Sequence, residues 1–152
     1  MPIRARYAHT NLIARDWRVL AGFYERVFGC TPVPPERHYS GAALEAGTGV
    51  ADATLDGLHL RLPGVGPDGP TLEIYTYSVQ PDAPPNPVNR PGFGHIAFVV
   101  DDVIAARAEV LGAGGRAVGD VTTLTTATGG VVTWCYVTDI EGNVIELQAW
   151  GA

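Results

Sequence analysis

The sequence repeats the same order of features in its two halves, and this repeat limits the possible folds more than any other feature. His9 lies seven residues before Asp16, and His95 lies seven residues before Asp102. In each half, a strand-like stretch that carries the histidine leads into a helix whose N-cap is the aspartate. Each half also ends in a strand with a glutamate beside a leucine, TLEIY in the first and VIELQ in the second. We therefore predict an internal duplication of about 70 to 80 residues, a β-α-β-β-β module used twice.

Hydrophobic periodicity places the elements of each half. Apolar residues recur at three- and four-residue spacing between Asp16 and Gly29, which predicts an amphipathic helix over 17–28. A second helix is predicted over 103–111, before a glycine-rich stretch that starts at Gly112. The proline-containing stretch 31–49 predicts a short edge strand, a loop and one helical turn. Strand-type patterns cover residues 5–14, 53–62, 71–77, 92–100, 131–139 and 144–150.

These elements predict a single α+β domain over residues 1–152, built from two tandem modules. Module one covers residues 4–78 and module two covers residues 92–150. The connector between them, residues 79–91, contains five prolines and shows no periodicity. Two such modules would form one curved, open-barrel-like mixed sheet with the helices on its convex side.

Charge and apolar content exclude several classes of partner. The chain has 10 Lys+Arg, 16 Asp+Glu and a pI near 5.0, with no basic cluster, so we expect no nucleic-acid binding. No apolar run approaches the roughly 20 residues of a membrane span, and the N-terminus has no signal-peptide pattern. The two widely spaced cysteines, Cys30 and Cys135, suit a reducing compartment. We therefore expect a cytoplasmic protein whose partner is a small molecule or another protein.

Four of the predicted strands each carry one side chain of a metal-ligand type on the face opposite their apolar residues. These side chains are His9, Glu73, His95 and Glu146. Any one of them alone is explained as well by a hydrogen-bonded or solvated strand residue. Their symmetric placement in the repeat favours a shared role, because two imidazoles and two carboxylates that converge would bind a divalent transition ion.

Three segments also carry a resemblance to a known family. They are HTNLIARDWRVLAGFYERVFG at 9–29, GHIAFVVDDV at 94–103 and DIEGNVIELQ at 139–148. In these segments the chain resembles the vicinal oxygen chelate superfamily, which includes glyoxalases, methylmalonyl-CoA epimerase, extradiol ring-cleaving dioxygenases and metal-free drug-binding resistance proteins. The resemblance implies one divalent metal ion, of Zn, Ni, Co, Mn or Fe, and a homodimer. Carried over by position, it assigns the metal ligands to His9, Glu73, His95 and Glu146.

The resemblance also favours some activities over others. Methylmalonyl-CoA epimerases typically have Gln where this chain has Glu73, so the ligand set is more similar to that of glyoxalases. We expect an isomerase, epimerase or lyase that acts through a metal-chelated enediolate on a small hydroxy-carbonyl or acyl substrate. Two alternatives stay open: an Fe(II)-dependent ring-cleaving dioxygenase, and a non-catalytic small-molecule-binding protein of the resistance type.

Removal of a substrate proton needs a base within about 3 Å of it. The resemblance to glyoxalases suggests Glu73 or Glu146 for this catalytic role, after release from the metal. His59 is a second catalytic candidate, because strand alternation points it away from the apolar face of 53–62. A partly exposed strand histidine without a catalytic role explains His59 equally well.

Several further residues are candidates for substrate contact. Arg61 could clamp a substrate carboxylate, although an ordinary surface arginine is an equal explanation. Asn11 and Tyr75 share strand faces with predicted ligands and could contact substrate or support the site. Trp134 and Tyr136 could line a pocket, but the sequence leaves open which face of their strand meets it.

Overall fold

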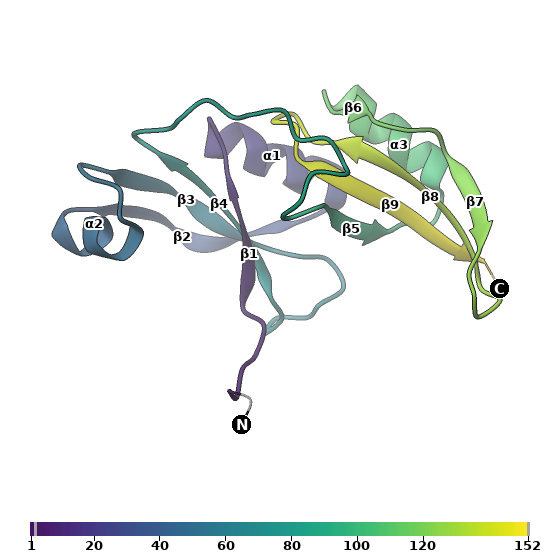
Figure 1. Cartoon of the computed structure of the whole chain (residues 1–152), viewed down its shortest axis with the longest axis horizontal. Helices are drawn as coiled ribbons and strands as arrows, with labels where there is room; N and C mark the ends of the chain where they lie inside the picture. Colours follow the sequence, from purple (N-terminus) through teal and green to yellow (C-terminus); the bar gives the residue numbers. More distant parts are fainter. Residues whose placement is uncertain (2, 152) are drawn as a thin grey trace. The chain divides into compact units, whose positions relative to one another are not determined.

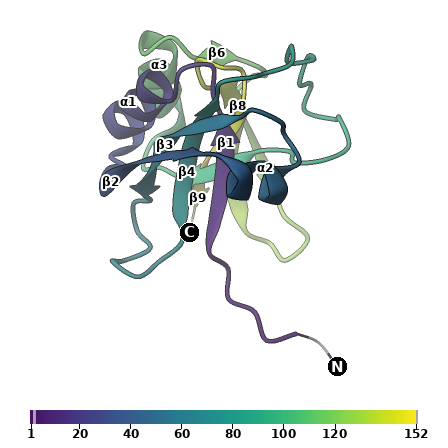
Figure 2. The same cartoon turned by 90° about the vertical axis from the view of Figure 1, so that its left-hand side faces the viewer.

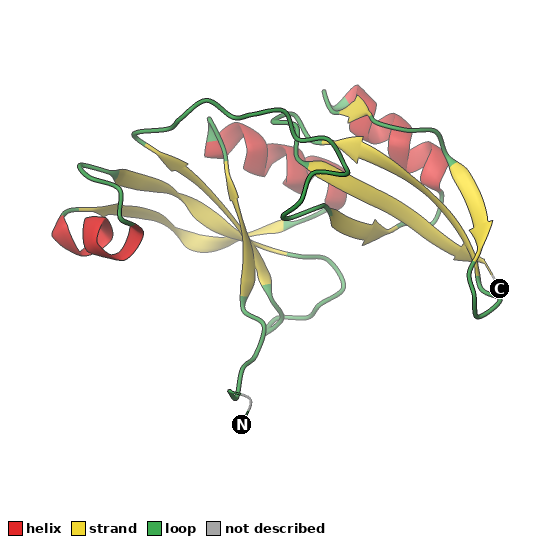
Figure 3. Cartoon of the chain, in the orientation of Figure 1, coloured by secondary structure: helices red, strands yellow, loops and turns green. Residues whose placement is uncertain are grey.

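The structure is a computed structural model that describes residue 1 and residues 3–151. The chain divides into two compact units, of which the first is Met1–Asp82 and the second begins at Ala83. Each unit contains a mixed sheet and at least one helix (Figure 1, Figure 3). The predicted α+β class is confirmed, and within the described residues neither sheet closes into a barrel. No helix in that part of the chain is long and apolar enough to cross a membrane.

The sheet of the first unit has the strand order β1-β4-β3-β2 (Figure 2). Its strands are β1 (His9–Ile13), β2 (Thr31–Ser40), β3 (Thr54–Arg61) and β4 (Thr71–Tyr77). β1 runs parallel to β4, while β3 runs antiparallel to both β4 and β2. The two central strands, β3 and β4, are therefore each flanked by a strand on both sides.

Helix α1 (Trp17–Phe28) begins and ends where its sequence predicts. The carboxylate of Asp16 accepts hydrogen bonds from the backbone N–H groups of Arg18 and Val19, which caps the first turn. Gly29 ends the helix in the left-handed conformation, with φ of 67°. The apolar face of α1 contacts β3 and β4. The fully buried side chains of this core are Leu20, Phe23, Tyr24, Leu60, Leu72 and Ile74.

The stretch 31–49 differs from its prediction. β2 is an edge strand as expected, but it has 10 residues, and α2 (Ala42–Thr48) has 7 residues rather than a single turn. Prolines are tolerated in β2 because an edge strand has no neighbour on its outer side to require their missing N–H groups. They still interrupt the ladder, since the register with β3 shifts between Val33 and Arg37.

The sheet of the second unit has the strand order β5-β9-β8-β6, and β7 also pairs with β8. Its elements are β5 (Ile96–Val99), α3 (Val103–Gly112), β6 (Arg116–Ala117), β7 (Thr122–Thr125), β8 (Val131–Thr138) and β9 (Val144–Gly151). β5 runs parallel to β9, as β1 does to β4, and Asp102 caps α3 as Asp16 caps α1. The second unit therefore repeats the order of the first, with the short strands β6 and β7 between α3 and β8 where the first unit has β2 and α2.

Two predicted strands are shorter in the structure. The pattern over 5–14 forms strand only from His9, and the pattern over 92–100 forms strand only from Ile96. The ladder partner explains the first limit, because β4 begins at Thr71, opposite His9. Strand propensity alone could not show this, since it does not reveal where the neighbouring strand starts.

Candidate functional site

A cluster of polar side chains surrounds Glu73 on one face of the first sheet. Glu73 lies on β4, with Asn11 of β1 and His59 of β3 as its direct cross-strand neighbours. Its Oε1 lies 2.8 Å from Nε2 of His59, and its Oε2 lies 3.4 Å from Nε2 of His9. The Asn11 amide donates to Oε2 at 3.5 Å. The two strand neighbours and His9 therefore contact both oxygens of one carboxylate, whose side chain is only 13% exposed.

Tyr75 extends this cluster along β4. Its hydroxyl lies 3.1 Å from Nε2 of His59. Burial, together with the negative charge of Glu73 and the nearby Tyr39 phenol, raises the pKa of Tyr75 to about 12. The phenol therefore stays protonated throughout the neutral range.

The His59 imidazole is held in its neutral form. Burial is the main cause that lowers the pKa of His59, and the neighbouring Arg37 and His9 side chains lower it further, against the opposing effect of Glu73. Because an ionised carboxylate only accepts hydrogen bonds, the short contact with Glu73 places the imidazole proton on Nε2. His59 therefore donates to Glu73 and fixes its orientation.

The second unit carries a smaller cluster at the corresponding strands. Nε2 of His95, the residue before β5, lies 2.9 Å from Oε2 of Glu146 on β9. The cross-strand neighbours of Glu146 are Ala97 and Tyr136. The Tyr136 ring lies 5.1 Å from the His95 ring and 5.0 Å from the Trp134 ring, centre to centre. Burial, and then the charge of Glu146, raises the pKa of Tyr136.

The two clusters correspond by strand and register but differ in their side chains. Glu73 and Glu146 occupy equivalent positions. Glu73 lies next to β1, whose first residue is His9, and Glu146 lies next to β5, which His95 precedes. His59 of the first unit corresponds to Tyr136 of the second, since each is the antiparallel partner of the glutamate. The first unit therefore surrounds its carboxylate with three nitrogen-bearing side chains, and the second places one imidazole and one phenol beside it.

The spacing of the histidine and glutamate atoms suits a divalent metal. Two ligand atoms about 2.1 Å from one ion lie roughly 3.0 to 3.4 Å apart at octahedral or tetrahedral angles. The contacts of His9 with Glu73 and of His95 with Glu146 measure 3.4 Å and 2.9 Å. Borderline N and O donors of this kind are typical for Zn, Ni, Co, Mn and Fe. The chemistry of each pair therefore fits such an ion.

Each unit supplies two facing donors rather than a complete site. Across residue 1 and residues 3–151, no three His, Cys, Asp or Glu side chains form a group that could hold an ion. The first unit shows the reason, because His9 and His59 approach different oxygens of Glu73 and their ring centres are 6.3 Å apart. The two imidazoles of this unit therefore do not point at a common position.

One predicted contact residue lies apart from the cluster, and other residues join it unexpectedly. The Arg61 guanidinium donates to the backbone carbonyl of Pro67, in the loop after β3. The charge of Arg37 lowers the pKa of both His59 and Tyr75. Apart from the nearby prolines, no sequence pattern marks Arg37 for this role. For Tyr136 a signal existed, because Tyr136 and Glu146 are equidistant from the turn at Glu141 and must pair if that turn is tight.

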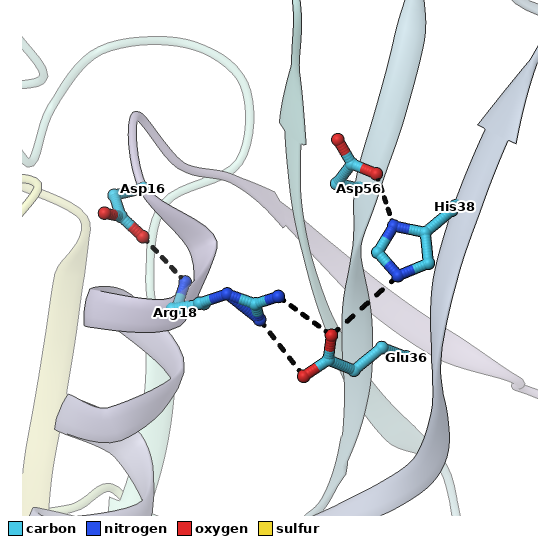
Figure 4. A network of polar contacts seen from close by, with 5 residues as sticks. All are labelled: Asp16, Arg18, Glu36, His38 and Asp56. Atoms are coloured by element: carbon cyan, nitrogen blue, oxygen red, sulfur yellow. Dashed lines mark hydrogen bonds and ion pairs between the residues drawn. The ribbon is translucent and has the colours of Figure 1, made fainter.

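A second polar network lies on the other face of the first sheet (Figure 4). Arg18 of α1 makes a two-pronged ion pair with Glu36, at 3.1 and 2.9 Å. Glu36 lies 3.8 Å from His38, whose Nδ1 is 2.6 Å from Asp56. A groove of about 420 Å³ between α1 and β2, lined in part by Trp17, Arg18 and Glu36, adjoins this network. All four side chains are more than 40% exposed, as expected for a solvated surface network.

Comparison with known proteins places the chain in a family. The model of the Glyoxalase/Bleomycin resistance protein/Dioxygenase superfamily matches residues 6–147. The chain belongs to this superfamily, which confirms the vicinal oxygen chelate resemblance of its sequence. No curated protein matches the sequence.

Solved structures share the fold at low sequence identity. A glyoxalase family protein from Bacillus cereus has a TM-score of 0.73 at 16% identity, over 100% of this chain and 97% of that protein. A glyoxylase/bleomycin resistance protein/dioxygenase domain from Frankia sp. has 0.59 at 15% identity, over 98% and 100%. A mutant of the fosfomycin resistance protein FosX from Listeria monocytogenes, solved with Mn(II) and 1S,2S-dihydroxypropylphosphonic acid, has 0.54 at 13% identity, over 97% and 93%. At these identities the likeness establishes the fold alone.

Proposed function

We propose that the protein is a divalent-metal-dependent isomerase, epimerase or lyase of the glyoxalase type, acting on a small hydroxy-carbonyl or acyl compound. One repeated pair carries this proposal. An imidazole Nε2 faces a glutamate oxygen at 3.4 Å in the first unit and at 2.9 Å on the corresponding strands of the second. Membership of a superfamily named for glyoxalases and dioxygenases supports the same broad class.

The proposed metal ligands are His9, Glu73, His95 and Glu146. When bound, a divalent cation polarises a carbonyl oxygen as a Lewis acid, which makes the neighbouring C–H group more acidic. Zn, Ni, Co, Mn and Fe all suit these donors. The Mn(II) in the FosX structure supports the inclusion of manganese in any test.

The side chains of the protein are proposed to move the substrate proton. Glu73, Glu146 and His59 are the candidate acids and bases, because they are partly buried groups able to take up a proton. His59 donates to Glu73 and so holds that carboxylate in one orientation. Return of the proton to the opposite face of the same carbon gives an epimer, and return to the adjacent carbon gives an isomer. Loss of a neighbouring hydroxyl gives elimination instead.

Asn11 and Tyr75 are the proposed substrate contacts on the first sheet. Both lie on the face of Glu73, and the protonated Tyr75 hydroxyl can donate to a substrate oxygen. Arg61 stays a prediction, because its guanidinium contacts the Pro67 carbonyl. The homodimer and the cytoplasmic location also stay predictions, although both cysteines are free thiols, as a reducing compartment favours.

Proton exchange tests the reaction class. The protein is loaded in turn with each of the five metals and incubated in deuterated water with hydroxy-ketones and acyl thioesters. We expect metal-dependent exchange of the proton next to the carbonyl, followed by NMR. Glu146→Gln and His59→Gln should each lower the exchange rate by at least about 100-fold, since general acid–base groups contribute factors of this size.

The controls separate this activity from the two alternatives. His38→Ala removes an exposed histidine of the second polar network and should leave exchange unchanged. Failure of exchange with every metal and substrate, in a protein that binds metal stoichiometrically, would exclude the proposed reaction. Oxygen uptake with catechols and Fe(II) would instead identify a ring-cleaving dioxygenase. Binding of these compounds by a protein that takes up no metal would identify a non-catalytic binding protein.

A further inference from the structure

One cation lies on the same face of the first sheet as His59 and Tyr75. Arg37 on β2 pairs with Gly57 on β3, and Gly57 pairs with Tyr75 on β4. Cross-strand partners project from the same face of a sheet. Gly57 separates Arg37 from Tyr75 without a side chain, and a Cβ at this position would lie 2.5 Å from Cδ1 of the Tyr75 ring. The Tyr75 ring therefore lies over Gly57, between the Arg37 strand and Glu73.

The Arg37 guanidinium is held in place by its own strand. Its Nη1 donates to the carbonyl of Val33 at 2.7 Å and to the carbonyl of Pro35. Pro34 and Pro35 have no N–H group, and the β2–β3 register shifts between Val33 and Arg37. The side chain thus supplies donors to a stretch of strand where the ladder is interrupted. This anchoring orients the guanidinium before any ligand arrives.

The rest of the guanidinium is available for a ligand. Among the described residues, the Nε and Nη2 groups of Arg37 have no hydrogen-bond partner, so one edge of the planar fork is open. An oriented guanidinium with an open edge matches the geometry of carboxylate, phosphate and phosphonate groups. In Arg61, the arginine that the sequence analysis predicted for this role, Nη1 donates a hydrogen bond to the loop carbonyl of Pro67.

We propose that Arg37 binds an anionic group of the substrate, so that the substrate is a hydroxy-carbonyl or acyl compound bearing a carboxylate, phosphate or phosphonate remote from the reacting carbon. This inference rests on the proposed function, because it assigns the substrate class of the same site. The Tyr39 and Tyr75 rings, 6.5 Å apart, lie on the same face and provide an aromatic surface for the part of the substrate between its two ends.

The competing explanation is that Arg37 only braces the irregular part of β2. The two explanations differ in what a substitution changes. Arg37→Gln keeps an amide donor for the carbonyls but removes the charge, and Arg37→Lys keeps the charge but loses the planar fork. A brace would affect folding stability and leave the preference for anions unchanged. An anion site would lose that preference in a folded protein.

Binding of matched compounds tests the proposal in the full-length protein. The probes are dihydroxyacetone phosphate, hydroxylevulinate and neutral hydroxyacetone, titrated by calorimetry into manganese-loaded protein. We expect each anion to bind wild type about tenfold or more tightly than hydroxyacetone, as a charged hydrogen-bonded pair provides. Arg37→Gln should abolish this difference, and Arg37→Lys should reduce it. Arg26→Gln, at an exposed arginine in the last turn of α1, is the control and should keep the wild-type difference. The phosphate and carboxylate arms show which anion the site prefers.

A metal-free measurement separates this inference from the proposed function. Inorganic phosphate is titrated into protein without metal, and its effect on the Arg37 guanidinium and neighbouring amide signals is followed by NMR. Phosphate binding that Arg37→Gln removes, in a protein that takes up no metal, would support the anion site and contradict the proposed function. Normal metal uptake with equal affinity for anionic and neutral probes in wild type, or a preference for anions that both Arg37 variants keep in full, would overturn the anion site alone. If Arg37→Gln does not fold, Arg37→Lys is the deciding variant. An Arg37→Lys protein that keeps the full preference for anionic probes and binds phosphate as wild type does would also overturn the anion site.

Discussion

At the scale of single residues, the two glutamates of the repeat are not interchangeable. Both oxygens of Glu73 have a nitrogen neighbour, from His59 on one side and from His9 and Asn11 on the other. Glu146 faces His95 through one oxygen and has the Tyr136 ring, not a histidine, across the strand pair. The first unit by itself therefore fixes the orientation of its carboxylate more completely.

The cysteine thiols provide a test of the residue environments. Burial, with a smaller contribution from Glu25, raises the pKa of Cys30 from its usual 9.0 to about 11, and burial also raises the pKa of Cys135. A rise of two pKa units lowers the thiolate fraction at neutral pH about 100-fold. We expect native protein at pH 8 to react with a thiol reagent at least about 100-fold more slowly than urea-unfolded protein, and faster as the pH rises toward 11. The unfolded protein should react with two equivalents of the reagent, one for each cysteine. Rapid reaction of one thiol in the native protein would contradict the prediction, because it would show that this thiol is exposed.

At the scale of elements, one turn sets the register of the second sheet. The carboxylate of the fully buried Asp139 accepts hydrogen bonds from the backbone N–H groups of Glu141 and Asn143, at 2.9 and 3.0 Å. Its other oxygen accepts from the Asn143 amide at 2.8 Å. A turn fixed in this way places Tyr136 opposite Glu146, since both lie five residues from Glu141. The DIEGN segment therefore positions the second cluster without contacting it.

Replacement of Asp139 tests this role. Asp139→Ala leaves buried N–H groups without acceptors, so we expect the free energy of unfolding to fall by about 3 kcal/mol. Asp139→Asn keeps one acceptor oxygen and should lose less. Chemical denaturation measures both variants, with Asp101→Ala, an exposed acid before α3, as the control. A loss below about 0.5 kcal/mol for Asp139→Ala would contradict the role of this turn.

The elements that the sequence predicted well are those with local signals. Asp16 and Gly29 bound α1, and alternating leucines mark β3, so short-range patterns suffice there. β2 and β7 lack such signals, because β2 contains prolines and the four residues of β7 are all exposed. Both are strands only because a neighbouring strand, β3 or β8, offers them a ladder. Tertiary pairing overrides weak propensity in these cases.

At the scale of the whole molecule, the repeat in the sequence is sufficient to identify the four histidine and glutamate candidates. Each half contains a histidine and a glutamate at matching positions, and the structure pairs them within each unit. The repeat could not reveal what is specific to one unit. His59 and Tyr136 occupy the same position with different chemistry, and the register shift in β2 places Arg37 opposite Gly57.

Metal addition tests the proposal at the same scale. Because an ion that binds only the folded protein stabilises it, a saturating divalent ion should raise the unfolding temperature. At a concentration 100 times the dissociation constant the stabilisation is about 2.7 kcal/mol, which corresponds to roughly 5 to 10 °C for a chain of this size. His9→Ala and His95→Ala should each reduce the shift in scanning calorimetry, and His38→Ala should not. An unchanged shift in both ligand variants would place the ion elsewhere.

The prolines of β2 also affect how the molecule behaves toward copies of itself. An unpaired strand at the border of a sheet is a template on which another extended chain can add, and uncontrolled addition leads to aggregation. β2 forms one such border, and its Pro32, Pro34 and Pro35 have no N–H group to donate to an added strand. The same residues that interrupt the ladder and leave carbonyls for Arg37 therefore protect this border from self-templated fibre growth.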